Sequence, residues 1–292
     1  MPKPFLSPKS DLVFKLIFGT PGNMDILAGF LQSVLDIPIG EYGRLEPRDP
    51  ALKPDSIRGK EVILDIKAVT AYGIIINVEI QLNPHPFMWE RFQYYLDRLF
   101  VEQISRGGEY GSLKKVVGVL ITDYILLTGI PEYHNQRRQL SPRHGSIGTD
   151  LKEMHILELP KLPRDPDGSE LWKWLKFIRS QEEEDFALIA QMGSKFRRAV
   201  EVLRAISENE ETRALNEARE KARMDEDARM LGAREEGKAD GIEKGRIYGF
   251  EDGKREGRIE MVRNALRMGM SPEAIVTLTG LPEETIRSLI GD

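Results

Sequence analysis

The sequence predicts an α/β protein with a central mixed β-sheet flanked by helices, followed by an all-helical C-terminal extension. Two β-branched runs flank Ala71-Tyr-Gly73, which is typical of two antiparallel strands joined by a short turn. The continuous apolar run over residues 115–123 is typical of a strand buried on both faces. Beyond Leu171 the apolar residues recur at helical spacing. Helices and strands that alternate in this way indicate a layered α/β plan.

The elements of the first half follow from local patterns. Apolar spacing predicts two helices between Phe14 and Leu35, broken at Thr20-Pro-Gly22. Residues 36–55 are rich in Pro and Gly and are expected to connect these helices to the hairpin. After the hairpin, an amphipathic helix is expected from about Phe87 to Arg106, and a further strand over 154–160.

The second half predicts helices over 171–178 and 186–206, followed by an internal repeat. A glycine stands at every fourth position from Gly237 to Gly257. Six glycines cost about 6 kcal/mol of helix propensity relative to alanine, so we expect a flexible or dynamically helical tether. The alternative is a self-associating helix that makes a homo-oligomer. Charged residues between the glycines argue against a membrane segment.

The last 35 residues predict a small helical module. An amphipathic helix over 258–268 is followed by a turn, with Ser271 as N-cap and Pro272 at the first helical position. Two short helices over 272–279 and 283–290 suggest a helix-turn-helix. A helix that reads DNA should present polar and basic side chains to base edges, but residues 282–289 contain one Arg and two Glu. A packing or protein-contact module is therefore at least as well supported as a DNA-reading one. We expect three domains, over 1–180, 181–257 and 258–292.

Composition excludes several classes of site. The chain of 292 residues has no cysteine, which rules out disulfides and thiolate zinc ligands. Its four histidines show no metal-ligand spacing and are expected to be surface or packing residues. No apolar run approaches the roughly 20 residues of a membrane span, so we expect a soluble, cytoplasmic protein without a membrane partner.

Charge is uneven along the chain. Residues 1–180 carry 23 Lys and Arg against 22 Asp and Glu, whereas 181–292 carry 19 against 25. A bulk basic field that would attract nucleic acid is therefore absent, and any such contact must come from a local patch. Surface solvation is the simpler explanation for most of the basic residues around the hairpin, which are Lys9, Lys15, Lys67, Arg91, Arg98, Lys114 and Lys115.

The hairpin carries the most informative pair of residues. Folding it about Tyr72 sets Asp65 opposite Glu79, and strand alternation puts Asn77, Glu79 and Gln81 on one face. Opposed carboxylates lie roughly 5 Å apart at Cβ and repel each other, and a divalent cation with oxygen ligands offsets this. The alternative is an ordinary hairpin with one solvated polar face.

The series Asp65…Glu79-Ile-Gln81 resembles the metal-binding core of the PD-(D/E)xK nuclease superfamily, in which a Lys usually stands where this chain has Gln81. Ser10-Asp-Leu-Val-Phe-Lys-Leu-Ile-Phe-Gly19 is similar to the opening of its recombination-promoting nuclease/putative transposase branch. The resemblance continues through Glu90-Arg91, Tyr94-Tyr95 and His155-Ile-Leu-Glu-Leu-Pro-Lys161 and covers about the first 200 residues.

The resemblance implies a restriction-endonuclease-like core and a metal-dependent DNA endonuclease. Asp65 and Glu79 would hold Mg²⁺ or Mn²⁺, and Gln81 would position water or donate to the phosphate, since it has no ionisable group. The proton-accepting step would then go to a metal-bound hydroxide or to Lys67. Asp11 matches a carboxylate often found on the first helix of the superfamily, although Ser10-Asp11 is also a good helix start. Candidates for contacts with DNA phosphates are Lys15, Lys67 and Arg91.

Two other function classes remain. The replacement of Lys by Gln81 also fits a catalytically inactive, nuclease-derived DNA-binding or protein-interaction protein. A purely structural α/β domain serving the C-terminal helices is the third class. In all three cases we expect residues from about 207 onward to contribute nothing to the folding of the α/β domain, because they are highly charged.

Overall fold

The computed structural model describes residues 3–35, 45–48, 51–52, 62–63, 65–104, 107–141, 145 and 150–290. The chain divides into two compact units, Met1–Glu220 and Lys221–Asp292. Most of the expected connection over 36–55 lies outside the described residues. No described helix combines the length and the apolar character needed to cross a bilayer.

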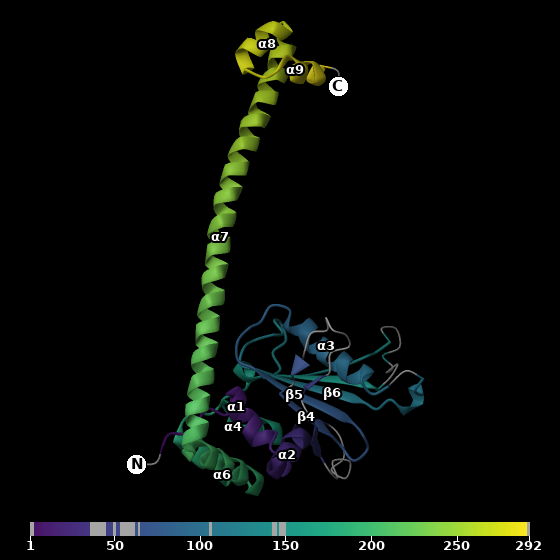
Figure 1. Cartoon of the computed structure of the whole chain (residues 1–292), viewed down its shortest axis with the longest axis vertical. Coiled ribbons are helices and arrows are strands. Elements are labelled where there is room, and N and C mark those ends of the chain that lie inside the picture. The colour runs from purple at the N-terminus through teal and green to yellow at the C-terminus, as the bar shows by residue number, and fades with distance from the viewer. Residues whose placement is uncertain are drawn as a thin grey trace. The chain divides into compact units, whose positions relative to one another are not determined.

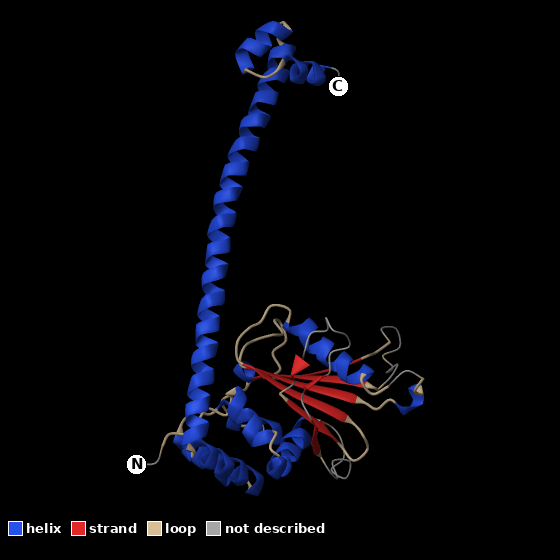
Figure 2. Cartoon of the chain, in the orientation of Figure 1, coloured by secondary structure: helices blue, strands red, loops and turns tan. Residues whose placement is uncertain are grey.

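The first unit is built on a six-stranded mixed sheet in the order β1-β4-β5-β6-β8-β7 (Figure 2). Neighbouring strands β5, β6 and β8 run parallel, whereas β1, β4 and β7 pair antiparallel with their neighbours. The expected mixed α/β sheet is thus confirmed. The strands are β1 (Glu46–Arg48), β4 (Ile66–Val69), β5 (Ile75–Gln81), β6 (Val116–Thr122), β7 (His134–Arg138) and β8 (Lys152–Glu158), with a separate pair β2 (Ala51–Leu52) and β3 (Val62–Ile63).

Helices cover both faces of this sheet (Figure 1). One face packs on α3 (Met88–Val101). The other face carries a large core to which helices of both chain halves contribute. These helices are α1 (Asp11–Phe18), α2 (Met24–Val34), α4 (Glu170–Arg179), α5 (Glu183–Gln191) and α6 (Ser194–Glu208). The single helix expected over 186–206 is two helices in the structure, interrupted at Met192 and Gly193.

Strand β6 is buried on both faces, as its apolar run predicts. Val117 and Val119 point into the large core, whereas Val116 and Leu120 point towards α3. Gly118 lies where α3 crosses the strand, and a Cβ there would stand 2.6 Å from Phe92 Cζ. The missing side chain therefore sets how closely α3 approaches the sheet.

The core does not end near residue 180, where we expected a domain boundary. Phe186 of α5 and both Phe196 and Leu203 of α6 are buried in the same cluster as the strands. The first compact unit accordingly runs to Glu220. Apolar stripes on α5 and α6 need a partner surface, and helices α1, α2 and α4 provide it.

The N-terminal segment is tied to the beginning of α7 (Glu210–Arg267). The main-chain N of Leu6 donates to Ser207 Oγ at 2.9 Å, Ser10 Oγ donates to the buried Asn216, and Arg213 donates to the carbonyl of Pro4. The expectation that residues from 207 onward contribute nothing to the fold is therefore wrong for residues 207–219. Polar side chains make these contacts, which is why apolar patterning did not reveal them.

Helix α7 continues without a break through the glycine repeat, where a flexible or dynamically helical tether was the first expectation. Charged pairs one turn apart support it, such as Lys244 with Asp240 and Arg246 with Glu243. Among the described residues, nothing lies within 4 Å of a Cβ built on any glycine from Gly237 to Gly257. The glycines are thus not needed for close packing within the chain.

The second unit ends in the expected helical module. The last turns of α7 pack with α8 (Pro272–Thr279) and α9 (Glu283–Ile290) around Val262, Ala265 and Ile275. Ser271 Oγ accepts from Ala274 N, as an N-cap does, and Gly280 ends α8 with φ +68°.

A chain that ends at Ile206 should be less stable than one that ends at Glu220. The shorter chain loses the hydrogen bonds of Ser207, Arg213 and Asn216 to the N-terminal segment, which correspond to roughly 3 kcal/mol of unfolding free energy. Urea unfolding followed by circular dichroism measures the difference. Equal midpoints for the two chains would show that residues 207–220 do not support the first unit.

Replacing Gly118 by alanine should destabilise the first unit by about 1–3 kcal/mol, because the new methyl group overpacks the contact with Phe92 and Leu96. Gly22→Ala is the matched control, since a Cβ at Gly22 meets nothing within 4 Å. Thermal melts of both variants and the parent chain provide the measurement. A Gly118→Ala melt at or above that of Gly22→Ala would contradict this packing.

Candidate active site

The hairpin formed by β4 and β5 has the register that strand alternation predicts. Ile66 pairs with Val78 and Lys67 with Asn77, and one further step sets Asp65, which immediately precedes β4, opposite Glu79. Gly73 takes φ +82° in the turn, a conformation that glycine adopts readily. The turn therefore fixes which residues oppose each other at the far end of the hairpin.

Each carboxylate accepts a hydrogen bond from the main chain of the opposite strand. The N–H of Ile80 donates to Asp65 Oδ2 at 2.9 Å, and the N–H of Asp65 donates to Glu79 Oε1 at 3.3 Å. Asn77 Nδ2 donates to the same Glu79 oxygen at 3.2 Å. These bonds hold the two acids together where β5 ends.

Burial makes this pair of acids unusual. The side chain of Glu79 is buried, and both this burial and the charge of Asp65 raise its pKa to about 8. Burial also raises the pKa of Asp65, and the ammonium of Lys15 opposes the rise only in part. The raised pKa values mean that the positive charge near the two acids is too small to stabilise both of them in the ionised form.

Helix α1 brings Lys15 and Asp11 to the pair. Lys15 Nζ lies 3.1 Å from Asp65 Oδ1 and 2.7 Å from Asp11 Oδ1. Burial acts to lower the pKa of Lys15, but the two carboxylates outweigh it and raise that pKa. Asp11 also pairs with Arg219 of α7 at 3.2 Å. Ser10 stands at the N-cap position, but its hydroxyl bonds Asn216 and does not cap α1.

The other two phosphate candidates lie on the α3 side of the sheet. Arg91 is close enough to Glu79 for its charge to oppose the rise in the Glu79 pKa, and its Nε donates to Tyr95. Lys67 reaches the end of α3 instead, with Nζ 3.8 Å from Glu102 Oε2. Of the lysines considered for this site, Lys15 is therefore the one with a direct carboxylate contact to Asp65.

Gln81 is the last residue of β5 and lies on the same face as Glu79 by strand alternation. Its side chain is half-buried. Its carbonyl accepts from the N–H of Asp123, and Asp123 in turn pairs with Lys9 at 2.6 Å. The position leaves the Gln81 amide at the rim of the carboxylate pair.

Two buried polar atoms that sequence reasoning did not single out lie near these groups. Within the described residues, neither Asn77 Oδ1 nor the hydroxyl of Tyr124 has a hydrogen-bond partner. The amide nitrogen of Asn77, Nδ2, donates a hydrogen bond to Glu79, and Arg91 lies close to Tyr124. A buried oxygen without a donor is costly unless something else satisfies it.

The residues present fit a hard divalent cation. Two carboxylates and an amide oxygen are the ligand types that Mg²⁺ prefers, with water and substrate phosphate filling the remaining positions. Among the residues described by the structure, no group of three or more His, Cys, Asp or Glu is arranged to hold a metal ion. A cation here would accordingly depend on Asp65 and Glu79 and on ligands that are not acidic.

A second buried polar cluster lies on the opposite face of the sheet. Glu153 Oε1 is 2.7 Å from His155 Nε2, and His155 Nδ1 is 2.8 Å from His134 Nε2. Burial and His155 lower the pKa of His134 to about 4. His134 and His155 are bonded to each other and to Glu153, and the cluster is separate from Glu79 because β8 turns Glu153 and His155 towards the large core.

A family model described as PD-(D/E)XK nuclease family transposase matches residues 8–233. The match covers well over half of the chain and includes the hairpin, α1 and the beginning of α7. The resemblance seen in the sequence is thereby confirmed. Comparison with curated proteins and with solved structures gives no match.

The metal-free protein should lose stability as the pH rises, because Glu79 has a pKa of about 8 in the fold against an ordinary 4.5. Between these values the folded chain keeps a proton that the unfolded chain has released, so the unfolding free energy falls by a few kcal/mol. Glu79→Gln should remove this slope, and Glu170→Gln should keep it. Urea titrations in EDTA from pH 5 to pH 8 measure the effect; parallel curves for all three proteins would contradict it.

Proposed function

Since the chain belongs to the PD-(D/E)XK nuclease family transposases, we propose that it is a metal-dependent endonuclease that hydrolyses phosphodiester bonds of DNA. The observation that carries this proposal is the buried pair of Asp65 and Glu79, each bonded to the main chain of the other strand. Such a pair has no evident packing role, because burying two acids together raises both pKa values.

Asp65 and Glu79 would hold the cation, Mg²⁺ or Mn²⁺, with the free oxygen of Asn77 beside them. When bound, such a cation lowers the pKa of a water ligand and stabilises negative charge on the scissile phosphate. Asp11 would complete the ligand shell through water. Asp11 and Asp65 lie close together, because the ammonium group of Lys15 contacts both of them.

The neighbouring side chains would orient the substrate. The Gln81 amide can hold a water molecule or donate a hydrogen bond to the phosphate, but it cannot accept a proton at neutral pH. Gln81 carries no positive charge where related nucleases usually have a Lys, and Lys15 of α1 would supply that charge instead. Lys67, the neighbour first considered for this role, is engaged with Glu102. Arg91 lies on the other side of Glu79 and would contact the phosphate from there.

A second function is favoured by one specific observation. Lys15 already contacts Asp65 and Asp11, as expected for a site that has exchanged its cation for a permanent ion pair. A chain of this kind would be a catalytically inactive, nuclease-derived DNA-binding or protein-interaction protein. The two functions differ in what a divalent cation does to the protein.

Nicking of supercoiled plasmid in Mg²⁺ tests the proposed activity. Asp65→Ala and Glu79→Ala should each reduce the rate by about 10²–10³-fold or more, since each removes a ligand that stabilises the transition state. Gln81→Ala should retain activity reduced about tenfold to a hundredfold, because it misplaces the water or phosphate.

Glu170→Gln, on α4 in the opposite layer, is the control and should nick like the parent chain. EDTA should abolish all nicking. Nicking that persists at the parent rate in Asp65→Ala would refute the assignment of the site. No nicking by the parent chain in either Mg²⁺ or Mn²⁺ would favour the inactive alternative.

A further inference from the structure

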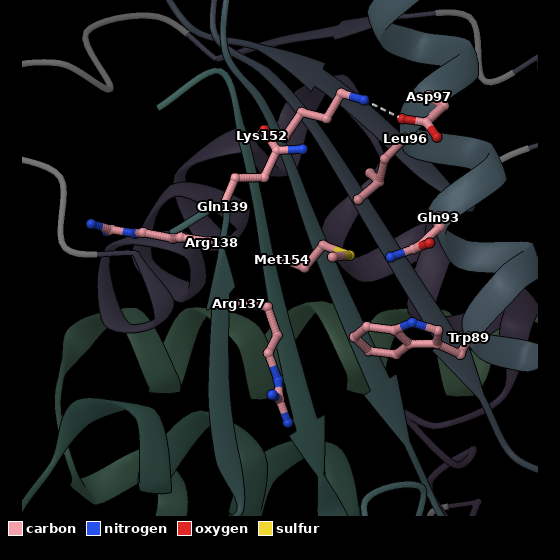
Figure 3. Close-up of a pocket in the computed structure, with 9 residues that line it drawn as sticks. All are labelled: Trp89, Gln93, Leu96, Asp97, Arg137, Arg138, Gln139, Lys152 and Met154. Carbon is pink, nitrogen blue, oxygen red and sulfur yellow. Dashed lines mark hydrogen bonds and ion pairs between the residues drawn. The ribbon is translucent and has the colours of Figure 1, made fainter. Parts of the chain in front are cut away.

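A pocket of about 370 Å³ opens between α3 and the strands β7 and β8. It lies on the α3 face of the sheet, the same face as Glu79, but over different strands. Figure 3 shows Trp89 and Gln93 of α3 on one side and Arg137 of β7 on the other, with Met154 between them. The volume falls in the range of small-molecule sites.

One flank of α3 faces the pocket, and the other flank faces the acid pair. Trp89, Gln93 and Asp97 follow one another at four-residue spacing and face the pocket. Arg91 and Tyr95 follow the same spacing on the flank that faces Glu79. Trp89 and Arg91 both belong to the first turn of α3, so the pocket and the carboxylate pair lie on either side of the same helix end.

Of the three cationic side chains among the described residues that line the pocket, two are paired with carboxylates. Lys152 is paired with Asp97, and Arg138 lies 3.1 Å from Glu153. Arg137 is exposed and pairs directly with Met154 across the strands, so it points to the pocket face. Within the described part of the chain Arg137 forms no ion pair. A guanidinium without a carboxylate suits an incoming phosphate.

The remaining walls suit a nucleobase. The indole of Trp89 is half-buried and packs on the α3 core, so one part of the ring is fixed while the rest faces the pocket. Met154 provides a second apolar surface, and the amides of Gln93 and Gln139 offer donors and acceptors for a base edge. An aromatic face, amides and a lone Arg together match a nucleotide better than an apolar ligand or an acidic peptide.

We propose that this pocket binds one nucleotide of single-stranded DNA, with its base stacked on Trp89 and its phosphate held by Arg137. The choice of DNA rests on the proposed nuclease function, whereas the nucleotide chemistry rests on the pocket itself. A duplex is too wide for a cavity of this volume, so the bound nucleotide must be unpaired. The strand would pass the N-terminal end of α3 to reach the carboxylate pair.

The test uses the full chain and a short fluorescein-labelled single-stranded DNA in EDTA, with binding followed by fluorescence anisotropy. Trp89→Ala and Arg137→Ala should each weaken binding about tenfold or more. Trp89→Phe keeps an aromatic face and should restore most of the affinity. Arg197→Ala, an exposed arginine on α6, is the matched control and should bind like the parent chain.

Intrinsic fluorescence locates the contact, because Trp172 and Trp174 are buried and Trp89 is the tryptophan that the strand can reach. The unlabelled strand should quench the parent chain and leave Trp89→Phe unquenched. Failure of the parent chain to bind the strand, or parent-like affinity in Trp89→Ala and Arg137→Ala, overturns the proposal. The assay contains no divalent cation, so it is independent of the outcome of the nicking assay.

Discussion

The burial of two carboxylates against each other at the end of the central hairpin is the constraint on which the rest of this structure depends. Burial raises the pKa of both Asp65 and Glu79, and the charge of Asp65 raises that of Glu79 further. The main-chain hydrogen bonds that hold the pair do not remove the cost of desolvating two acids. The ammonium of Lys15 offsets part of it. Helix α1 must therefore pack at this end of the sheet and present Lys15 and Asp11 to the hairpin.

The position of α1 depends in turn on residues from the far side of the first unit. Its aromatic residues Phe14 and Phe18 are buried in the core shared with α4 and α6. The segment that precedes α1 is bonded to Ser207 and Asn216, and Asp11 itself pairs with Arg219. The beginning of α7 thus supports the acid pair through the N-terminal segment. A site that reads as one hairpin in the sequence is stabilised by contacts some 200 residues apart along the chain.

Features set by neighbouring residues could be predicted from the sequence, whereas contacts between residues far apart in the chain could not. The register that opposes Asp65 to Glu79 follows from one Gly-containing turn and strand alternation, and β6 follows from its apolar run. Polar composition hid β7, an edge strand that pairs with β8. The sequence also left open which lysine lies at the acids, because Lys15 and Lys67 differ in their distance from Asp65 only after α1 has packed. Charged pairs one turn apart offset part of the low helix propensity of the glycines in α7, and the glycine pattern on its own did not predict a continuous helix.

On this view the pair of Asp65 and Glu79 is there to bind a divalent cation. Electron paramagnetic resonance of Mn²⁺ added to the metal-free protein tests it most directly, because free and bound Mn²⁺ give distinct signals. We expect one bound ion per chain. Binding should strengthen as the pH rises past the Glu79 pKa of about 8, and it should be lost in Asp65→Asn and Glu79→Gln. Glu170→Gln should bind as the parent chain does. Equal Mn²⁺ binding in the parent chain and in Asp65→Asn, or none in either, would contradict it.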